Sequence, residues 1–451
     1  MASNIKHIDL EDIRKAIEDN NHKFLIPILT EMYPADIAEI LDELSLDEAK
    51  YIYHLLDKEE AAAMLMELEE DVRERFVNSF STTEIARDLI HNLDSDDAAD
   101  LINELPGDVR VEVLSQITDR QQAQNIADLL YYPADTAGGL MAKELVKVNI
   151  SWHVVTCIRE MRSQAAEVEH VYAVYVVDDD NVLMGLLSLK SLLIASPRDK
   201  ISDLYTTDII SVKAHQKAEE VAQIMNKYDL VVLPVVDELD RLIGRITIDD
   251  VVDFIKDEAD KDYQLMSGIS HDIETSDKIW ELTHGRLFWL IVALFGGIIG
   301  SRVIANYEEQ ISIYPEMAFF MPLIAAMAGN VGVQSSALIV QALANNTLTG
   351  GIVPRLFKEL SVGLINGLVC SGLLLGYALF FAPSLPLSMT VSVSLLTVIL
   401  FASVFGTFVP LALHKFKIDP ALATGPFITT SNDIIGLFIY FMIGRLMYGL
   451  F

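Results

Sequence analysis

Residues 425–444 read GPFITTSNDIIGLFIYFMIG, a run in which Asp433 is the only charged side chain. A helix of about 20 apolar residues crosses the hydrocarbon layer of a bilayer, so this run predicts a membrane-spanning helix. With four earlier apolar runs it makes five predicted spans, at approximately residues 286–304, 317–344, 361–382, 391–413 and 421–450. Residues 285–451 are therefore predicted to form an all-α transmembrane domain of five helices.

The charge of the chain is divided unevenly between its two parts. The net charge is −32, yet from Glu281 onward seven acidic and seven basic residues cancel. The surplus negative charge lies in residues 1–280, where it attracts divalent cations and repels nucleic acid. The two cysteines, Cys157 and Cys370, have no Cys or His cluster around them, which argues against a disulfide framework or a thiolate metal site.

The N-terminus lacks the apolar core of a signal peptide, so residues 1–280 are expected in the cytoplasm. Five spans then place the C-terminus outside the cell, in a multi-pass protein of the plasma membrane surrounded by lipid. The positive-inside rule supports this orientation. The cytoplasmic loops then carry the basic residues Arg355, Lys358, Lys415 and Lys417. The first external loop carries the acidic residues Glu308, Glu309 and Glu316.

An internal repeat marks residues 1–136. The segment 57–80 aligns with 94–117 at an offset of 37 residues, and Asp57, Ala61 and Glu67 are among the residues that recur. The apolar positions follow a helical period, so we expect stacked helix pairs in an acidic α-helical superhelix.

A second repeat predicts two α/β modules, at residues 137–200 and 201–256. Matching β-α-β-β-α patterns are offset by 64 residues at Met141 and by 59 at Gly185. The pair resembles tandem CBS modules, which can bind adenosyl ligands such as ATP. The second copy keeps the pattern G-x-x-[ST]-x-x-D as Gly244, Thr247 and Asp250, whereas the first copy has Ser191 in place of the aspartate.

Asp433 is the candidate ion-binding residue of the membrane part. An ionised carboxylate at the centre of a spanning helix costs about 2.5–3.5 kcal/mol, so it needs a role. A polar stripe accompanies it at helical spacing and predicts a water-filled path: Pro426, Thr429, Asp433, Gly436 and Tyr440. The alternative is a buried ion pair with Arg445, which lies about 18 Å further along the helix axis.

A second polar stripe lies in the second predicted span. Asn330, Gln334 and Gln341 fall on one helical face, and Gly329 and Gly332 flank Asn330. These glycines would let a backbone carbonyl point into the path. The alternative is that the amides and Ser335 or Ser336 only hold helices together.

The segment 257–284, with the acidic residues just before it, is expected to be a connecting helix. Its carboxylates crowd around only Lys256 and Lys261, so divalent cations would reduce their repulsion. A solvated charged helix is the alternative interpretation.

Taken together, the chain resembles the MgtE family of magnesium channels over essentially its whole length. The residues that carry the resemblance are Gly329, Asn330, Gly332, Gln334, Ser335, Pro420, Pro426, Asp433 and Gly436. The resemblance implies a homodimer with a pore on its two-fold axis, Asp433 in contact with hydrated Mg²⁺, and the connector as a plug helix. It also implies that cytosolic Mg²⁺ closes the pore.

The resemblance further implies which residues sense cytosolic Mg²⁺. They are Asp96, Asp100, Asp229, Asp250, Asp253, Glu258 and Asp262, with Glu59 or Glu60 a weaker match. Two positions depart from the family pattern. Lys261 replaces a carboxylate, and Gly425 stands where an asparagine can occur.

Several other functions are compatible with the sequence. The path would suit Mn²⁺, Co²⁺ or Ni²⁺ as well, since one carboxylate with amide oxygens fits a hydrated divalent ion. An efflux protein, a CBS-regulated anion channel or a sensor without a pore are further alternatives. Small-xxx-small patterns at Gly363/Gly367 and Gly372/Gly376 make helix association in a dimer plausible. No enzyme activity is expected, because no P-loop is present and the membrane potential would supply the driving force.

Overall fold

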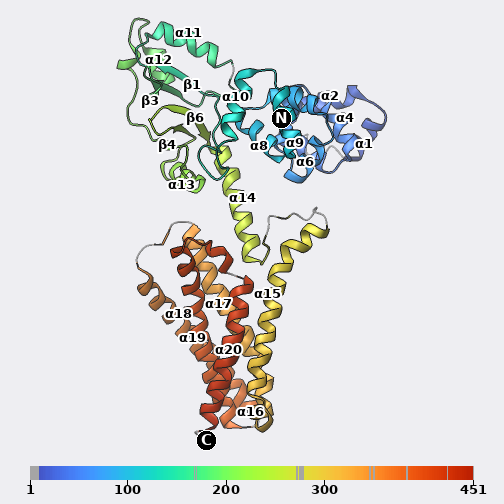
Figure 1. The fold of residues 1–451 in the computed structure, drawn as a ribbon, viewed down its shortest axis with the longest axis vertical. Helices are drawn as coiled ribbons and strands as arrows, with labels where there is room; N and C mark the ends of the chain where they lie inside the picture. The colour runs from blue at the N-terminus through green and yellow to red at the C-terminus, as the bar shows by residue number, and fades with distance from the viewer. Residues whose placement is uncertain are drawn as a thin grey trace. The chain divides into compact units, whose positions relative to one another are not determined.

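The computed structural model describes residues 10–166, 168, 170–270, 273, 279–344, 347–348, 351–381, 384–423 and 425–449. The chain forms two compact units, which divide between Lys256 and Asp257. The described residues of the first unit make helices and two three-stranded sheets, and those of the second unit make long helices (Figure 1).

Short helices open the first unit. Their bounds are α1 (Leu10–Glu18), α2 (His22–Glu31), α3 (Pro34–Asp42), α4 (Leu46–Tyr53), α5 (Lys58–Met66), α6 (Glu70–Val77), α7 (Thr82–Glu84), α8 (Ser95–Glu104), α9 (Gly107–Gln116) and α10 (Arg120–Leu129). The repeat in the sequence becomes two matching helix pairs, α5 with α6 and α8 with α9. The predicted helical N-terminal domain is therefore confirmed.

The two copies of the repeat differ at the residue before their first helix. The Asp57 carboxylate accepts a hydrogen bond from the backbone N–H of Glu60 at 2.9 Å and caps α5. Asp94, its counterpart, makes no side-chain cap on α8 and instead lies 3.4 Å from the guanidinium of Arg245. One copy thus keeps the structural role of this aspartate, and the other directs it toward a different domain.

The α/β part of the first unit contains two copies of one motif. The first is β1 (Val146–Asn149), α11 (Val154–Gln164), β2 (Val174–Val177), β3 (Leu183–Leu187) and α12 (Leu189–Ile194). The second is β4 (Val212–Lys213), α13 (Ala218–Tyr228), β5 (Val232–Val236), β6 (Leu242–Thr247) and the start of α14 (Ile248–Met266). Each sheet has a parallel pair followed by an antiparallel pair. The predicted tandem modules are confirmed.

Two glycines allow the backbones of the two modules to come into close contact. Gly244 in β6 faces the segment before β1, where an added Cβ would lie 2.8 Å from the carbonyl oxygen of Ala142. Gly185 in β3 faces the segment before β4, where an added Cβ would collide with the carbonyl oxygen of Thr206. Backbone bridges join the same segments, so each module completes the sheet of the other.

The helical domain and the second module share one hydrophobic core. Buried residues of α8 such as Leu101 belong to the same cluster as Val221, Leu233 and Ile246 of the second module. The first module has a separate core, which includes Val146 and Val176. This continuity brings the start of α8 close to β6 and α14, where the acidic residues of both parts meet.

The described part of the second unit contains five helices long and apolar enough to cross a membrane. They are α15 (Ile279–Asn306), α17 (Met321–Ala344), which a 3₁₀ turn extends back to Pro315, α18 (Ile352–Phe381), α19 (Leu385–Lys415) and α20 (Gly425–Tyr448); the short α16 (Glu308–Ile313) follows α15. The predicted number of spans is confirmed. Helix α19 is the most buried, and α17 and α18 pack along it, while α15 packs along α20 (Figure 1).

The helices extend beyond the apolar runs that predicted them. Arg355 and Lys358 were expected in a loop but lie in the first turns of α18, and Lys415 is the last residue of α19. A hydropathy pattern ends where the first charge appears, whereas a helix continues because long basic side chains extend to the membrane surface. The placement of these residues in loops was therefore wrong.

Glycines Gly363 and Gly367 pack within one chain. A methyl group added to Gly363 would collide with Ser403 of α19, and one added to Gly367 would lie 2.7 Å from Leu396 of the same helix. These glycines therefore bring α18 against α19, and their assignment to a contact between two chains was wrong. Gly372 and Gly376 have no described atoms within 4 Å of an added Cβ.

Candidate functional site

Asp433 lies in the middle of α20 and faces α17. A methyl group added to Gly329 of α17 would lie 3.2 Å from Oδ1 of Asp433 and 3.0 Å from Cγ2 of Thr429. Gly329 thus lets α17 approach the carboxylate closely, and a larger residue at this position would press against Thr429 and Asp433. Oδ1 is buried and has no hydrogen-bond partner among the described residues. The structure brings together Gly329, Thr429 and Asp433 as the sequence predicted.

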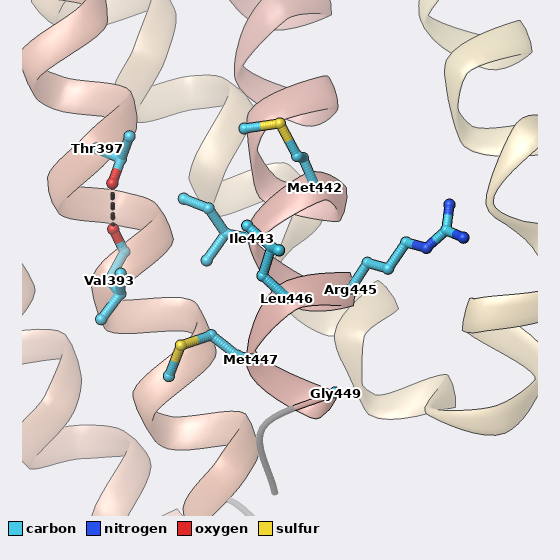
Figure 2. Close-up of a pocket in the computed structure, with 8 residues that line it drawn as sticks. All are labelled: Val393, Thr397, Met442, Ile443, Arg445, Leu446, Met447 and Gly449. Carbon is cyan, nitrogen blue, oxygen red and sulfur yellow. Dashed lines mark hydrogen bonds between the residues drawn. The ribbon is translucent and has the colours of Figure 1, made fainter.

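Arg445 lies outside this site. It is exposed and is one of the residues that line a hollow of about 680 Å³ between α19 and α20 (Figure 2). That hollow is lined mainly by apolar groups such as Met442 and Leu446, and the hydroxyl of Thr397 there donates to the carbonyl of Val393 at 2.9 Å. The structure records no ion pair of Arg445 among the described residues, so the alternative of a buried Asp433–Arg445 pair finds no support.

The remaining residues of the α20 stripe are packed against protein. The hydroxyl of the fully buried Tyr440 donates to the carbonyl of Met317 at 2.9 Å. A methyl group added to Gly436 would lie 3.0 Å from Ala328. The expectation that Gly436 and Tyr440 line a water-filled path was therefore wrong, because a stripe on a helical wheel does not distinguish a wet face from a face in contact with another helix.

The amides of α17 are on the surface of the unit. Asn330, Gln334 and Gln341 are all exposed, whereas Gly329 and Gly332 on the neighbouring face are buried. Exposed amides in a spanning helix cannot lie in hydrocarbon without cost, since nothing there satisfies their hydrogen bonds. This face therefore needs either water or a further protein surface.

A cluster of carboxylates lies in the first unit, where α8 meets the second module. We call Asp94, Asp96, Asp97, Asp100, Glu144 and Asp250 the acidic cluster. Oxygen atoms of Asp94, Asp96 and Glu144 lie within 4.8 Å of one another and can reach one metal ion. Glu144 is held in place by Ser95, whose hydroxyl donates to Oε2 at 2.6 Å. Carboxylate oxygens at this spacing are ligands that Mg²⁺ prefers.

Burial and mutual repulsion raise the pKa values of this cluster. The pKa of Asp97 is raised to about 7, mainly by loss of solvent and then by the charges of Asp250 and Asp100. Burial and neighbouring charges also raise the pKa of Asp96 well above its usual value. They raise the pKa of Asp100 to about 6, and the largest repulsion on Asp100 comes from Glu104. Removing water from several like charges favours protonation, or a bound cation in its place.

Asp250 connects this cluster to the predicted nucleotide pattern. Its Oδ2 accepts hydrogen bonds from the backbone N–H of Thr247 at 2.9 Å and from the Thr247 hydroxyl at 2.5 Å. Burial raises the pKa of Asp250, and these two bonds oppose the rise. One oxygen thus fixes the orientation of the carboxylate.

Two arginines, the buried Arg245 and the partly buried Arg73, offset part of the negative charge. Arg245 of β6 is 6% exposed, donates to the carbonyl of Glu144 at 2.5 Å and lies 3.4 Å from Asp94. Arg73 donates to Glu104 at 2.5 Å and lowers the pKa values of Asp97 and Asp100. The arginines therefore compensate part of the negative charge of the acidic cluster.

Other predicted sensor residues lie elsewhere. Glu59 is exposed in the first turn of α5, and Asp229 is exposed at the end of α13 with a left-handed φ of 51°. Within the described residues, neither is among the charged neighbours of the acidic cluster. Asp253 is exposed on α14.

The connector is helical in its first part. Glu258 and Asp262 lie half-buried on α14, and Lys261 pairs with Glu258 at 3.4 Å. Of the expected connector 257–284, residues 271–272 and 274–278 lie outside the described part of the chain.

The end of α14 packs against the beginning of α20. Gly425 has a φ of +49°, and a Cβ there would collide with the carbonyl oxygen of Met266. A Cβ on Gly268 would lie 2.5 Å from Cγ of Pro426. Gly425 thus permits a close contact between the connector and the first turn of α20, and an asparagine at this position would prevent the contact.

Some residues of the site were not predicted. Asp94, Asp97, Glu144 and Arg245 were missed because they come from three separate segments whose meeting depends on the shared core. Asn432 was also missed; it is fully buried in α20, and neither of its amide atoms has a partner among the described residues. A signal for Asn432 was present, since it is a second polar residue beside Asp433.

Known families match most of the chain. A family described as a divalent cation transporter, MgtE, matches residues 321–443. The MgtE intracellular N domain matches residues 32–135, and the CBS domain matches residues 137–198 and 201–257.

Individual relatives match over nearly the full length. The chain is 33% identical over 416 residues to the magnesium transporter MgtE of Bacillus subtilis, and the matched region covers 92% of this chain and 92% of the relative. It is 31% identical over 443 residues to that of Thermus thermophilus, covering 96% of this chain and 97% of the relative. A solved structure, the cytosolic domain of the Mg²⁺ channel MgtE in complex with ATP, has a TM-score of 0.51 at 31% identity and covers 55% of this chain and 100% of that one.

Proposed function

This chain belongs to the MgtE family of divalent cation transporters, as its residues predicted, and from that premise we propose that it carries Mg²⁺ into the cell down the electrochemical gradient. As a member it is a multi-pass membrane transport protein with an N domain of the intracellular type, and not an enzyme. Its orientation in the plasma membrane, with the C-terminus outside, is part of the proposal. A potential of 100 mV supplies about 2.3 kcal/mol per charge to an entering cation.

Asp433 is the proposed contact for the hydrated ion. The observation that supports this role is a carboxylate in a spanning helix whose Oδ1 faces Gly329 of α17 and has no hydrogen-bond partner among the described residues. Mg²⁺ usually keeps several waters and is held by one or two carboxylates. Thr429 and Pro426 lie on the same helix toward its N-terminal end, while Asn330 and Gln334 present their amides from α17.

A homodimer would complete the path. Asn330 and Gln334 are exposed on a spanning helix, and a second copy would cover or enclose this face so that it does not meet lipid. Two copies of Asp433 near one axis would also supply the second carboxylate. Cross-linking of the protein in membranes should give a dimer, and a result of monomers only would remove this part of the proposal.

The acidic cluster is the proposed sensor that closes the path when cytosolic Mg²⁺ is high. Bound Mg²⁺ would replace repulsion between α8 and the second module by attraction, and so stabilise one arrangement of the unit. Asp96, Asp100 and Asp250 belong to this cluster, and Asp229, Asp253, Glu258, Asp262 and Glu59 are proposed as further ligands. The connector, as the plug, would transmit this state to the membrane unit.

ATP is a proposed ligand of the second CBS copy. The solved cytosolic relative is described in complex with ATP, and Thr247 and Asp250 keep the nucleotide pattern in this chain. Ser191 in the first copy supplies no carboxylate, so the proposal is confined to one module.

The central experiment is Mg²⁺ flux into liposomes that contain the wild-type chain or Asp433→Ala. We expect the variant to lose most of the flux, because its spanning helix then offers the ion no charge. Asp419→Ala is the matched control, since Asp419 is an exposed aspartate that caps a short turn before α20. Undiminished flux in Asp433→Ala would refute the assignment.

A further inference from the structure

Five fully buried polar side chains in the membrane unit have no hydrogen-bond partner among the described residues, each 0% exposed. Two of them, Thr390 and Ser394, lie in the first half of α19. The other three are Asn432 of α20, Ser336 of α17 and Thr407 of α19. Both the Oδ1 and the Nδ2 atoms of Asn432 are unpaired. Buried polar groups in native proteins are almost always paired, by protein or by ordered water, so these atoms need a partner.

Asn432 lies at one crossing of α17 and α19, and Ser336 and Thr407 follow the glycines of this crossing along their own helices. A Cβ on Gly406 of α19 would lie 3.0 Å from Cα of Gly332 in α17, so the two backbones touch. A Cβ on Gly332 would collide with Nδ2 of Asn432, which places the amide against the same point. Ser336 follows Gly332 by one helical turn on the same face, and Thr407 follows Gly406 directly.

The chemistry of these groups fits water and not a metal ion. A water molecule both donates and accepts hydrogen bonds, as an amide and two hydroxyls require, and it occupies small polar cavities in protein interiors. Asn432, Ser336 and Thr407 carry no charge, whereas a divalent cation needs carboxylates.

We infer that Asn432, Ser336 and Thr407 bind a small cluster of ordered water molecules between α17, α19 and α20. This inference extends the proposed function, on which its link to the ion rests. Gly329 contacts Asp433 and Gly332 contacts Asn432, so the water lies within one turn of the carboxylate. Water at this place would polarise in response to the charge of Asp433 and of the passing ion, and so lower the cost of both in the membrane.

The experiment compares thermal unfolding of the full-length protein in detergent for wild type and Thr407→Val, which keeps the shape and removes the hydroxyl. If the hydroxyl binds water, its loss leaves the water short of a partner, and we expect the melting temperature of the membrane unit to fall by roughly 2 °C or more. If the site is dry, removal of an unsatisfied hydroxyl will leave the temperature unchanged or raise it. That result would overturn the inference.

A matched control and a second variant keep the test specific. Thr397→Val on the same helix removes a hydroxyl that bonds only to its own backbone, at Val393, and should change the temperature less than Thr407→Val. Asn432→Leu and Thr407→Val combined should be non-additive, because both side chains act through the same water. Strict additivity would overturn the shared cluster. These readouts need no ion flux, so a failure of the Asp433→Ala test would remove the link to the ion path and leave the water site standing.

Discussion

Binding of Mg²⁺ to the acidic cluster will release more protons at pH 6 than at pH 8. The pKa of Asp97 is raised to about 7 and that of Asp100 to about 6. At pH 6 these groups together hold about 1.4 protons, and at pH 8 about 0.1. Because a carboxylate must be ionised to bind a metal, Mg²⁺ displaces these protons as it binds.

The same shifts set the pH dependence of stability without metal. In the folded state both groups bind protons more strongly than an aspartate of the unfolded chain does, since its pKa has the ordinary value of 3.8. The free energy of unfolding of the metal-free unit therefore falls as the pH rises from about 4 to about 7 and levels off above that. The rise in the pKa of the half-buried Asp97 from 3.8 to about 7 corresponds to a free energy on the order of 4 kcal/mol. Mg²⁺ will recover most of this loss at pH 8.

Titration calorimetry of the full-length protein with Mg²⁺ measures the proton count. Each pH is run in two buffers of different ionisation enthalpy, and the difference in heat gives the protons released. Asp97→Asn should lower the count at pH 6 by about one proton, because its amide does not titrate. Equal release at pH 6 and pH 8, or none at pH 6, would show that the cluster does not bind the ion and would refute the reasoning.

Two further changes test single contacts. Urea unfolding should show that Arg245→Met destabilises the metal-free first unit by roughly 2 kcal/mol. The loss is smaller than for a fully buried ion pair, because Asp94 is 32% exposed. Arg241→Met, at an exposed arginine, is the control, and an equal loss of stability in both variants would count against a special role of Arg245. Gly425→Ala should displace the end of α14, because an alanine in the left-handed conformation costs about 1–2 kcal/mol and its Cβ would collide with Met266. The displacement should speed tryptic cleavage at Lys256 and Lys261. Gly372→Ala, at a glycine in open space, should leave the cleavage rate unchanged, and an unchanged rate in Gly425→Ala would refute the contact between α14 and α20.

The fold was largely predictable because its signals are local. Five long apolar runs, a 37-residue helical repeat and a β-α-β-β-α repeat each depend on nearby residues, and each is present in the structure. Even the irregularities repeat, since the strand register shifts at Val176/Val177 and again 59 residues later at Val235/Val236. Helix ends were less predictable, because charged residues such as Arg355 interrupt hydropathy without ending a helix.

The candidate sites were only partly predictable because they depend on contacts between distant segments. Asp433 stood out as one charge in an apolar run, which is a local feature. Glu144 and Arg245 gave no such signal; their importance comes from a core that joins α8 to the second module. Tyr440 shows the opposite error, since it shares a helical face with Asp433 but donates to a neighbouring backbone.

The two candidate sites differ in how far neighbouring residues compensate their negative charge. In the acidic cluster, Arg245 and Arg73 already compensate part of the charge, so the affinity for a divalent cation is lower than six free carboxylates would give. Moderate affinity is what the proposed sensor needs, because it must release the ion when the concentration falls. At Asp433 the described residues offer Oδ1 no hydrogen-bond donor. Under the proposed function, that carboxylate contacts the hydrated ion, and one such carboxylate from each copy binds weakly enough to let the ion pass on.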